Sequence, residues 1–240
     1  MATAPSHAQL MDEVYRHQRY FYDFTRKYYL LGRDRLIRNL ALAPEERLVE
    51  VGCGTARNLI CMARRYPEAR FYGLDASEQM LETARGQIEG AGLGTRIKVA
   101  QGYGEALTPA LFGVPHFERT VFSYSLSMIP DWRGALRAAQ GSLAPQGRLH
   151  VVDFGDFTGF GSVGQALMYA WLSLFHVEPR LAILNHLEMV FDSKEAALEG
   201  KLEILRGRYA FIFEGTAGFL SQILPDVADA TQPLEFPTVP

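Results

Sequence analysis

Residues 49–59 read VEVGCGTARNL, and this stretch decides the fold class of the chain. Residues 47–51 predict a short, largely apolar strand, which runs directly into a glycine-rich turn. Glycine lets the backbone turn tightly and come close to a ligand where a side chain would block the approach. A helix follows, with Leu59, Ile60 and Ala63 at helical spacing. The stretch therefore indicates the first strand–turn–helix unit of an open α/β sheet.

Strands and helices continue to alternate along the chain. Further strands are predicted over residues 70–74, 96–100, 116–124 and 148–154. One intervening helix has Ser77 as its predicted N-cap, and another covers residues 132–143. Residues 202–215, LEILRGRYAFIFEG, indicate two strands around an Arg-Gly turn. We therefore predict an α/β fold with a Rossmann-like, doubly wound, mostly parallel seven-stranded sheet, an antiparallel C-terminal edge strand and an N-terminal helical cap.

The chemistry of the glycine-rich turn narrows the class of ligand. A dinucleotide fingerprint has the form G-x-G-x-x-G, but Arg57 occupies the last glycine position. This large side chain argues against nicotinamide and flavin dinucleotides. Glu50, just before the first glycine, suits a cationic ligand such as a sulfonium amino acid. Asp75 ends the next strand and can accept hydrogen bonds from both hydroxyls of a ribose.

With these residues the sequence resembles the class I S-adenosylmethionine-dependent methyltransferases. It matches their motif E/D-x-G-x-G-x-G, except that Ala56 replaces the last glycine. The resemblance implies S-adenosylmethionine as the cofactor, with Gly52 and Gly54 against its methionine moiety and Asp75 on its ribose. It also implies contacts near the adenine or the sulfonium from Ala76, Met80, Gly104, Glu105, Tyr124 and Ser125.

A narrower resemblance rests on three segments: YRHQRYFYDFTRKYYLLGRDRLI at 15–37, FSYSLSMIPDW at 122–132 and LHVVDFGDF at 149–157. They resemble the diacylglyceryl-homoserine N-methyltransferases, and WLSLFHVEPR at 171–180 also fits that family. The likeness covers residues 14–180 and is weaker in the tail. It implies that the acceptor is the amine of a homoserine ether lipid, methylated three times to diacylglyceryl-trimethylhomoserine, a betaine lipid.

The N-terminal segment is both aromatic and basic. Seven of the fifteen residues 15–29 are aromatic, and residues 16–38 contain seven Lys or Arg. Such a helix suits an anionic membrane surface. It suits equally a cap whose tyrosines pack on the sheet while the arginines remain solvated. We expect Tyr22 and Tyr29 to face the cofactor, and Arg33 to reach a carboxylate of the cofactor or substrate.

Catalysis on an amine requires loss of the ammonium proton. Asp153 and Asp156, at the end of the fifth strand, are the expected nearest carboxylates, although salt-bridge or capping roles fit them as well. Tyr22, Tyr28 and Tyr124 are candidates for a cage that stabilises the methylated cation by cation–π attraction. Tyr22, Tyr124 and Asp153 are therefore the predicted catalytic residues.

Residues 157–177 contain no Asp, Glu, Lys or Arg. Their apolar part is too short to cross a bilayer, so a buried helix is the favoured interpretation. A lid over an apolar substrate and an element that enters a membrane surface are the alternatives. His150, inside the fifth strand, is predicted to be a core histidine, and His176 is left open.

The bulk composition fits one domain. The chain has 240 residues, 48% hydrophobic and 21% charged, and a net charge of −3, which gives no reason to expect nucleic acid. Cys53 and Cys61 are too few for a disulfide framework or a zinc cluster, and no metal is expected. The predicted parts are a helical cap (1–40), a cofactor-binding core (41–156), an apolar substrate or lid region (157–200), and edge strands with a tail (201–240).

We expect a cytoplasmic enzyme that associates peripherally with the inner face of the membrane, because the first residues lack a secretory signal. Its expected partners are a lipid with an amino-acid head group and an anionic membrane surface. The alternatives are a C- or O-methyltransferase of a quinone or another hydrophobic molecule, and a non-catalytic, membrane-associated protein that binds the cofactor.

Overall fold

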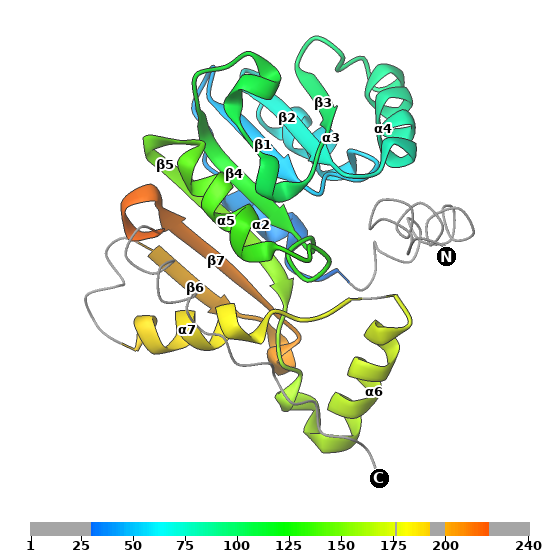
Figure 1. Cartoon of the computed structure of the whole chain (residues 1–240), viewed down its shortest axis with the longest axis vertical. Helices are drawn as coiled ribbons and strands as arrows, with labels where there is room; N and C mark the ends of the chain where they lie inside the picture. Colours follow the sequence, from blue (N-terminus) through cyan, green and yellow to red (C-terminus); the bar gives the residue numbers. More distant parts are fainter. Residues whose placement is uncertain (1–29, 176, 193–199, 221–240) are drawn as a thin grey trace, which may run out of the picture.

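The glycine-rich stretch lies in the middle of a seven-stranded sheet with the order β3-β2-β1-β4-β5-β7-β6 (Figure 1). A computed structural model describes residues 30–175, 177–192 and 200–220. Its strands are β1 (Arg47–Val51), β2 (Arg70–Asp75), β3 (Ile97–Gln101), β4 (Phe117–Ser123), β5 (Leu143–Phe154), β6 (Gly200–Ile204) and β7 (Ala210–Thr216). Its helices are α2 (Arg33–Asn39), α3 (Arg57–Arg65), α4 (Glu78–Gly90), α5 (Trp132–Gly141), α6 (Gly161–Ser173) and α7 (Leu181–Phe191). Short 3₁₀ turns are η1 (Gly104–Ala106), η2 (Pro109–Phe112), η3 (Thr158–Phe160) and η5 (Arg206–Arg208).

The pairing of the strands confirms the predicted Rossmann-like topology. Strands β3, β2, β1, β4 and β5 pair in parallel, whereas β7 is antiparallel to both β5 and β6. The chain builds outward from β1 to β3 and then crosses to the other side of β1 to form β4. The order therefore reverses between β1 and β4, and in open α/β sheets ligands bind at the carboxyl ends of the strands at such a switch point.

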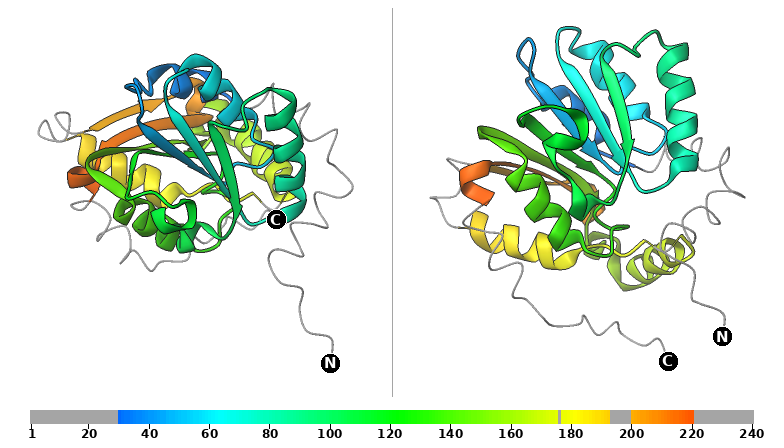
Figure 2. Two further views of the ribbon diagram at one scale, coloured as in Figure 1. Left: turned by 90° about the horizontal axis from the view of Figure 1, so that it is seen from above. Right: turned by 45° about the horizontal axis from the view of Figure 1, so that its top comes forward.

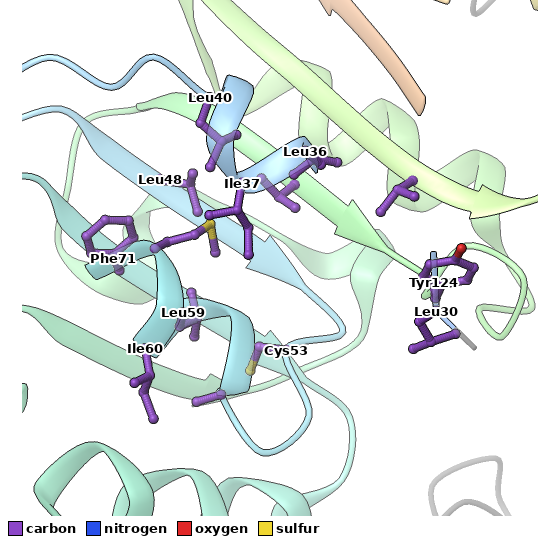
Figure 3. Close-up of a cluster of buried hydrophobic side chains, with 14 of the residues drawn as sticks. Leu30, Leu36, Ile37, Leu40, Leu48, Cys53, Leu59, Ile60, Phe71 and Tyr124 are labelled. Atoms are coloured by element: carbon purple, nitrogen blue, oxygen red, sulfur yellow. The ribbon is translucent and has the colours of Figure 1, made fainter. Parts of the chain in front are cut away.

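Two apolar layers cover the two faces of the sheet (Figure 2). Helices α2, α3 and α4 pack on one face through residues such as Leu36, Leu59 and Leu81. Helices α5 and α7 pack on the other face through residues such as Leu136 and Leu184. Figure 3 shows part of the first layer, where side chains of α2, β1 and α3 point toward one another. The periodic apolar residues of the sequence thus become the buried faces of the helices.

The predicted helix signals act as expected. The Ser77 side chain caps α4 by accepting a hydrogen bond from the backbone N–H of Met80 at 3.3 Å. Helix α3 ends before Tyr66, where Pro67 follows in the sequence. One boundary differs from the prediction, because β5 begins at Leu143 and not at Arg148. The register shifts between these two residues, and this irregularity hides the start of the strand in the sequence.

The predicted apolar region contains two helices, α6 and α7. The buried-helix interpretation of residues 157–177 is wrong for α6, because Leu172 is its only buried residue. The uncharged sequence allows burial, but the other side chains of this helix are partly or fully exposed in the structure. Most of the helical cap predicted over residues 1–40, namely residues 1–29, lies outside the described residues. Within the described residues, no helix is both long enough and apolar enough to cross a membrane.

Candidate active site

A cavity lies at the carboxyl ends of β1, β2 and β4, at the switch point of the sheet. Nine of the predicted cofactor residues line it: Gly52, Gly54, Asp75, Ala76, Met80, Gly104, Glu105, Tyr124 and Ser125. The sequence analysis missed the other lining residues: Val51, Leu74, Ser77, Gly102, Tyr103, Met128, Ile129 and Pro130. Four of these eight, Val51, Leu74, Ser77 and Tyr103, directly flank a predicted residue, so for them the strand ends themselves were the available signal.

The glycine-rich turn shapes the floor of the cavity. Gly52 has φ +76°, and a Cβ atom there would lie 2.5 Å from the Cβ atom of Ser125. Only glycine fits this position without a shift of the neighbouring turn. Gly54 has φ +53°, but a Cβ atom there would meet no atom within 4 Å. Gly52 is therefore required by the packing of the protein, whereas Gly54 borders open space in which a ligand fits.

Asp75 joins the two loops that border the cavity. Its Oδ2 accepts a hydrogen bond from the backbone N–H of Gly54 at 2.7 Å, and its Oδ1 accepts one from Ser77 at 3.0 Å. Each carboxylate oxygen has a second lone pair for a further donor. The carboxylate is therefore held in place at the cavity wall and keeps the capacity to accept hydrogen bonds from a ribose.

Glu50 does not line the cavity, which corrects the prediction of a direct contact with a cationic ligand. It is buried in β1, and its Oε1 accepts a hydrogen bond from Nδ2 of Asn58 at 2.7 Å. The same amide group also donates to Oγ of Ser123 at 3.2 Å. Strand alternation turns the side chain of Glu50 away from the cavity and toward α3. Glu50 and Asn58 thus hold α3 against the sheet behind the turn.

Tyr124 and Ser125 turn the chain sharply at the end of β4. Tyr124 has φ +57°, a conformation that costs a non-glycine residue about 1–3 kcal/mol and often marks a functional site. Its hydroxyl donates to the carbonyl oxygen of Leu31 at 2.6 Å, and burial raises the pKa of this phenol well above its usual value. Tyr124 therefore lines the cavity but stays protonated, so it does not act as a base.

Asp153 lies behind the cavity and not in its wall, which corrects its predicted place beside the substrate. Its Oδ2 accepts a hydrogen bond from the backbone N–H of Ser127 at 3.1 Å, and its Oδ1 accepts one from Phe154 at 2.8 Å. Burial raises the pKa of Asp153 to about 6. This carboxyl group therefore holds the turn after β4, and that turn forms one wall of the cavity.

Asp156 is also removed from the candidate proton acceptors. Burial acts to raise its pKa, but hydrogen bonds from Arg208 and Thr158 outweigh this effect and lower it. Nε of Arg208 lies 2.9 Å from both carboxylate oxygens, and the same guanidinium donates to Glu188 on α7. Asp156 is therefore part of a salt bridge between the loop after β5, the β6–β7 hairpin and α7.

Arg180 is a residue that the sequence analysis missed. Its Nε donates to the carbonyl oxygen of Leu126 at 3.1 Å, and its Nη2 donates to that of Ile129 at 2.9 Å. The backbone N–H of Glu178 donates to the carbonyl oxygen of Ser127 at 2.9 Å. The segment between α6 and α7 is thus hydrogen-bonded to the turn after β4, which Asp153 also holds through the backbone N–H of Ser127.

The remaining predicted residues lie elsewhere. Arg33 is buried in α2 and is not among the residues that line the cavity. His150 is a core histidine, as predicted, and burial lowers its pKa to about 3. Tyr22, Tyr28, Tyr29 and His176 lie outside the described residues, so their roles stay predictions.

Residues 48–147 match the family described as a methyltransferase domain. The chain is also 28% identical over 134 residues to the demethylmenaquinone methyltransferase of Geobacillus kaustophilus, an alignment that covers 55% of this chain and 56% of that protein. The chain therefore spans about half the length of this curated relative.

Solved structures share the fold around the methyltransferase domain. The S-adenosylmethionine-dependent methyltransferase SibL superposes with a TM-score of 0.59 at 22% identity, covering 82% of this chain and 57% of that one. A S-adenosylmethionine-dependent methyltransferase from Aquifex aeolicus superposes with a TM-score of 0.56 at 13% identity, covering 80% of this chain and 93% of that one. Together with the domain family, these structures confirm the predicted fold class and imply S-adenosylmethionine as the cofactor.

The cavity of the methyltransferase domain fits this cofactor. Asp75 offers carboxylate oxygens for ribose hydroxyls, and the open space at Gly54 admits a ligand close to the backbone. Met80, Leu74 and Ile129 supply apolar wall for an adenine ring. When bound, the cofactor supplies an electrophilic methyl group on a sulfonium sulfur. The turn held by Asp153 and Arg180 forms one wall of the same cavity.

Proposed function

We propose that the chain transfers methyl groups to the amine of diacylglyceryl-homoserine, three times in succession, and so forms the betaine lipid diacylglyceryl-trimethylhomoserine. The narrow resemblance over residues 14–180 motivates this choice of acceptor. One structural observation carries it: the uncharged helix α6 leads to Phe175, which packs against Met80 in the cavity wall. An apolar surface thus adjoins the cofactor cavity.

This surface favours an acceptor that carries hydrocarbon chains. Burial of one CH₂ group contributes about 0.8 kcal/mol, so a few methylenes on apolar protein surface outweigh one polar contact. Phe175 also packs with Trp171, whose ring centroid is 5.4 Å away. A polar head group would then lie toward the turn after β4, and its hydrocarbon chains would lie along α6.

The acceptor amine loses one proton before each methylation, because only its lone pair can form the new N–C bond. The S–CH₃ bond breaks at the same time, and its electron pair stays on sulfur. Asp153 and Asp156 are engaged with backbone amides and with Arg208, so we propose that water in the open cavity takes up the proton. The third methylation leaves a quaternary ammonium, and we propose that the aromatic ring of Tyr124, a residue of the cavity lining, stabilises this charge by cation–π attraction.

The test is methyl transfer from labelled S-adenosylmethionine to vesicles that contain diacylglyceryl-homoserine, with product masses recorded. Mass gains of one, two and three methyl groups on the lipid are expected. The Asp75→Ala variant is the matched control, because it lacks the carboxylate proposed to bind the ribose. Unmethylated lipid in the presence of demonstrated cofactor binding would refute the proposed acceptor.

A second candidate function is methylation of a quinone. It is favoured by the relative from Geobacillus kaustophilus, which is named a demethylmenaquinone methyltransferase. The apolar surface at Phe175 suits a prenylated ring as well as acyl chains. The same vesicle assay, with demethylmenaquinone in place of the amino lipid, separates the two candidates by which molecule gains mass. Cofactor binding without turnover of either acceptor would favour a non-catalytic protein.

A further inference from the structure

The outer face of α6 exposes large apolar side chains. Val163 is 72% exposed, Leu167 66% and Leu174 72%. Their spacing of four and seven residues places them on one face of the helix. Phe160, 47% exposed, extends this face at the start of α6. We call these four residues the α6 outer face.

The charged residues that border this face leave a basic side chain exposed beside it. Residues 157–177 contain no charged side chain, so aliphatic groups are not interspersed with ions along the helix. The acidic residues that adjoin this run in the sequence are paired, Asp156 with Arg208 and Glu178 with Arg180. Phe160 lies against Gly207, where an added Cβ atom would be 2.8 Å from the ring, and the neighbouring Arg206 is exposed. The rim therefore presents a basic group beside the apolar residues.

Helix α6 connects this face with the cofactor cavity. It projects from the edge of the sheet at which β5 ends (Figure 1). Its opposite side is anchored by the buried Leu172, and Phe175, just beyond its end, packs against Met80 in the cavity wall. A layer of lipid on the outer face would thus stand one helix diameter, about 10 Å, from the apolar surface proposed for the acceptor chains.

We propose that the α6 outer face, together with Arg206, docks on the surface of an anionic lipid bilayer. This inference rests on the proposed lipid acceptor. A helix of 13 residues is about 20 Å long and lies in the plane of the interface, with Val163, Leu167 and Leu174 below the head groups. The uncharged aliphatic surface favours the hydrocarbon boundary, and the basic rim favours anionic head groups.

The test is flotation of the full-length chain with vesicles of phosphatidylcholine, with and without phosphatidylglycerol. We expect binding to the anionic vesicles and weaker binding to the neutral ones. The triple variant Val163→Ser, Leu167→Gln, Leu174→Gln should bind at least about tenfold more weakly. Arg206→Gln should bind about fivefold more weakly. Met189→Gln is the matched control, because Met189 on α7 is as exposed as Leu167, at 66%, and should leave binding unchanged.

Several outcomes would overturn docking on lipid. Absence of binding to anionic vesicles, or equal binding by the wild type and the triple variant, would do so. A wild-type dimer that the triple variant converts to a monomer, without vesicle binding, would assign the face to a second copy of the chain. Circular dichroism and the thermal midpoint establish that each variant is folded, and exposed positions are expected to pass this check.

Methylation assays separate this proposal from the proposed function. The triple variant should methylate diacylglyceryl-homoserine in detergent micelles at the wild-type rate, but in vesicles more slowly. Vesicle binding that depends on the outer face, without methylation of the lipid in either medium, would support docking and refute the acceptor. Methylation at equal rates by both proteins in vesicles would support the acceptor and refute docking.

Discussion

The turn after β1, which lines the cavity, and helix α6, which lies beside it, are positioned by different physical means. Gly52 and Asp75 are held by backbone hydrogen bonds and close packing, and they leave little freedom of position. Helix α6 buries only Leu172 and exposes the rest of its apolar side chains in part or in full. The cofactor side is thus specified by fixed polar geometry, whereas the proposed acceptor side is specified by apolar area.

The largest effect is expected at Gly52. In Gly52→Ala the new Cβ atom would lie 2.5 Å from Cβ of Ser125, at φ +76°, so the turn must shift. We expect a loss of affinity for S-adenosylmethionine of at least about a hundredfold, measured by titration calorimetry. Gly113→Ala, at a similar φ of +69° but outside the cavity lining and with no atom within 4 Å of the added Cβ, is the control and should keep the wild-type affinity. Equal affinities for the two variants would remove the distinction between them.

Asp153, which holds the turn after β4 at the cavity wall, should make the free energy of unfolding depend on pH. Its pKa is about 6 in the folded protein, against 3.8 for an unperturbed aspartate. The folded state holds the proton more tightly, so this group's contribution to the free energy of unfolding is present below pH 4 and is lost as the pH rises through 6. The loss is about 3 kcal/mol.

The Asp153→Asn variant should therefore lose less stability than the wild type between pH 4 and pH 7. The measurement is urea unfolding at each pH in both proteins. If the free energies of unfolding of the two proteins changed equally with pH, the raised pKa of the buried Asp153 carboxyl group would be contradicted.

The polar geometry of the cofactor side is tested at Asp75. We expect Asp75→Ala to weaken cofactor binding about 10- to 100-fold, because hydrogen bonds to a charged group contribute about 1.5–3 kcal/mol. Asp75→Asn should keep part of the affinity, since one oxygen acceptor remains. The surface carboxylate Asp34 offers a control, and its replacement by Asn should leave the dissociation constant unchanged. An unaltered dissociation constant for S-adenosylmethionine in Asp75→Ala would refute the assignment of Asp75 as the residue that binds the ribose.

Arg180 links the segment after α6 to the turn after β4, so its replacement should affect both the stability of the protein and the cavity wall. Arg180→Gln removes donors from the carbonyl groups of Leu126 and Ile129 and should lower the free energy of unfolding by about 1–3 kcal/mol. We also expect a raised KM for the cofactor, which Arg180→Lys should partly restore. Arg137→Gln on the exposed surface of α5 is the control. A stability loss without any change in KM would limit Arg180 to a structural role.

The smallest effect is expected on the outer face of α6. Leu167→Gln should change the free energy of unfolding by no more than about 0.5 kcal/mol, because the side chain is exposed. Thermal denaturation of the variant and the wild type provides the measurement. A larger loss would mean that this face is packed in the native protein, and the contrast between the two regions would disappear.

Local patterns in the sequence were sufficient for the fold and for most of the cofactor side. The strand 47–51 and the cap at Ser77 were predicted correctly because periodicity and capping act over a few residues. Gly52, Gly54 and Asp75 were found because turn chemistry at strand ends is local as well. The antiparallel C-terminal pairing was also readable, from two strands joined by an Arg-Gly turn.

Only the tertiary structure decided the roles of the charged residues. Asp156 meets Arg208 across 52 positions of sequence, and Arg180 meets Leu126 across 54. Neither pairing leaves a periodic or local signal. Glu50 illustrates the same limit, since strand alternation and the position of Asn58 place its carboxylate behind the turn. Sequence by itself determined where the cavity forms, because backbone geometry is local. Burial and partners determine which carboxylates face that cavity, and both arise only when distant segments pack together.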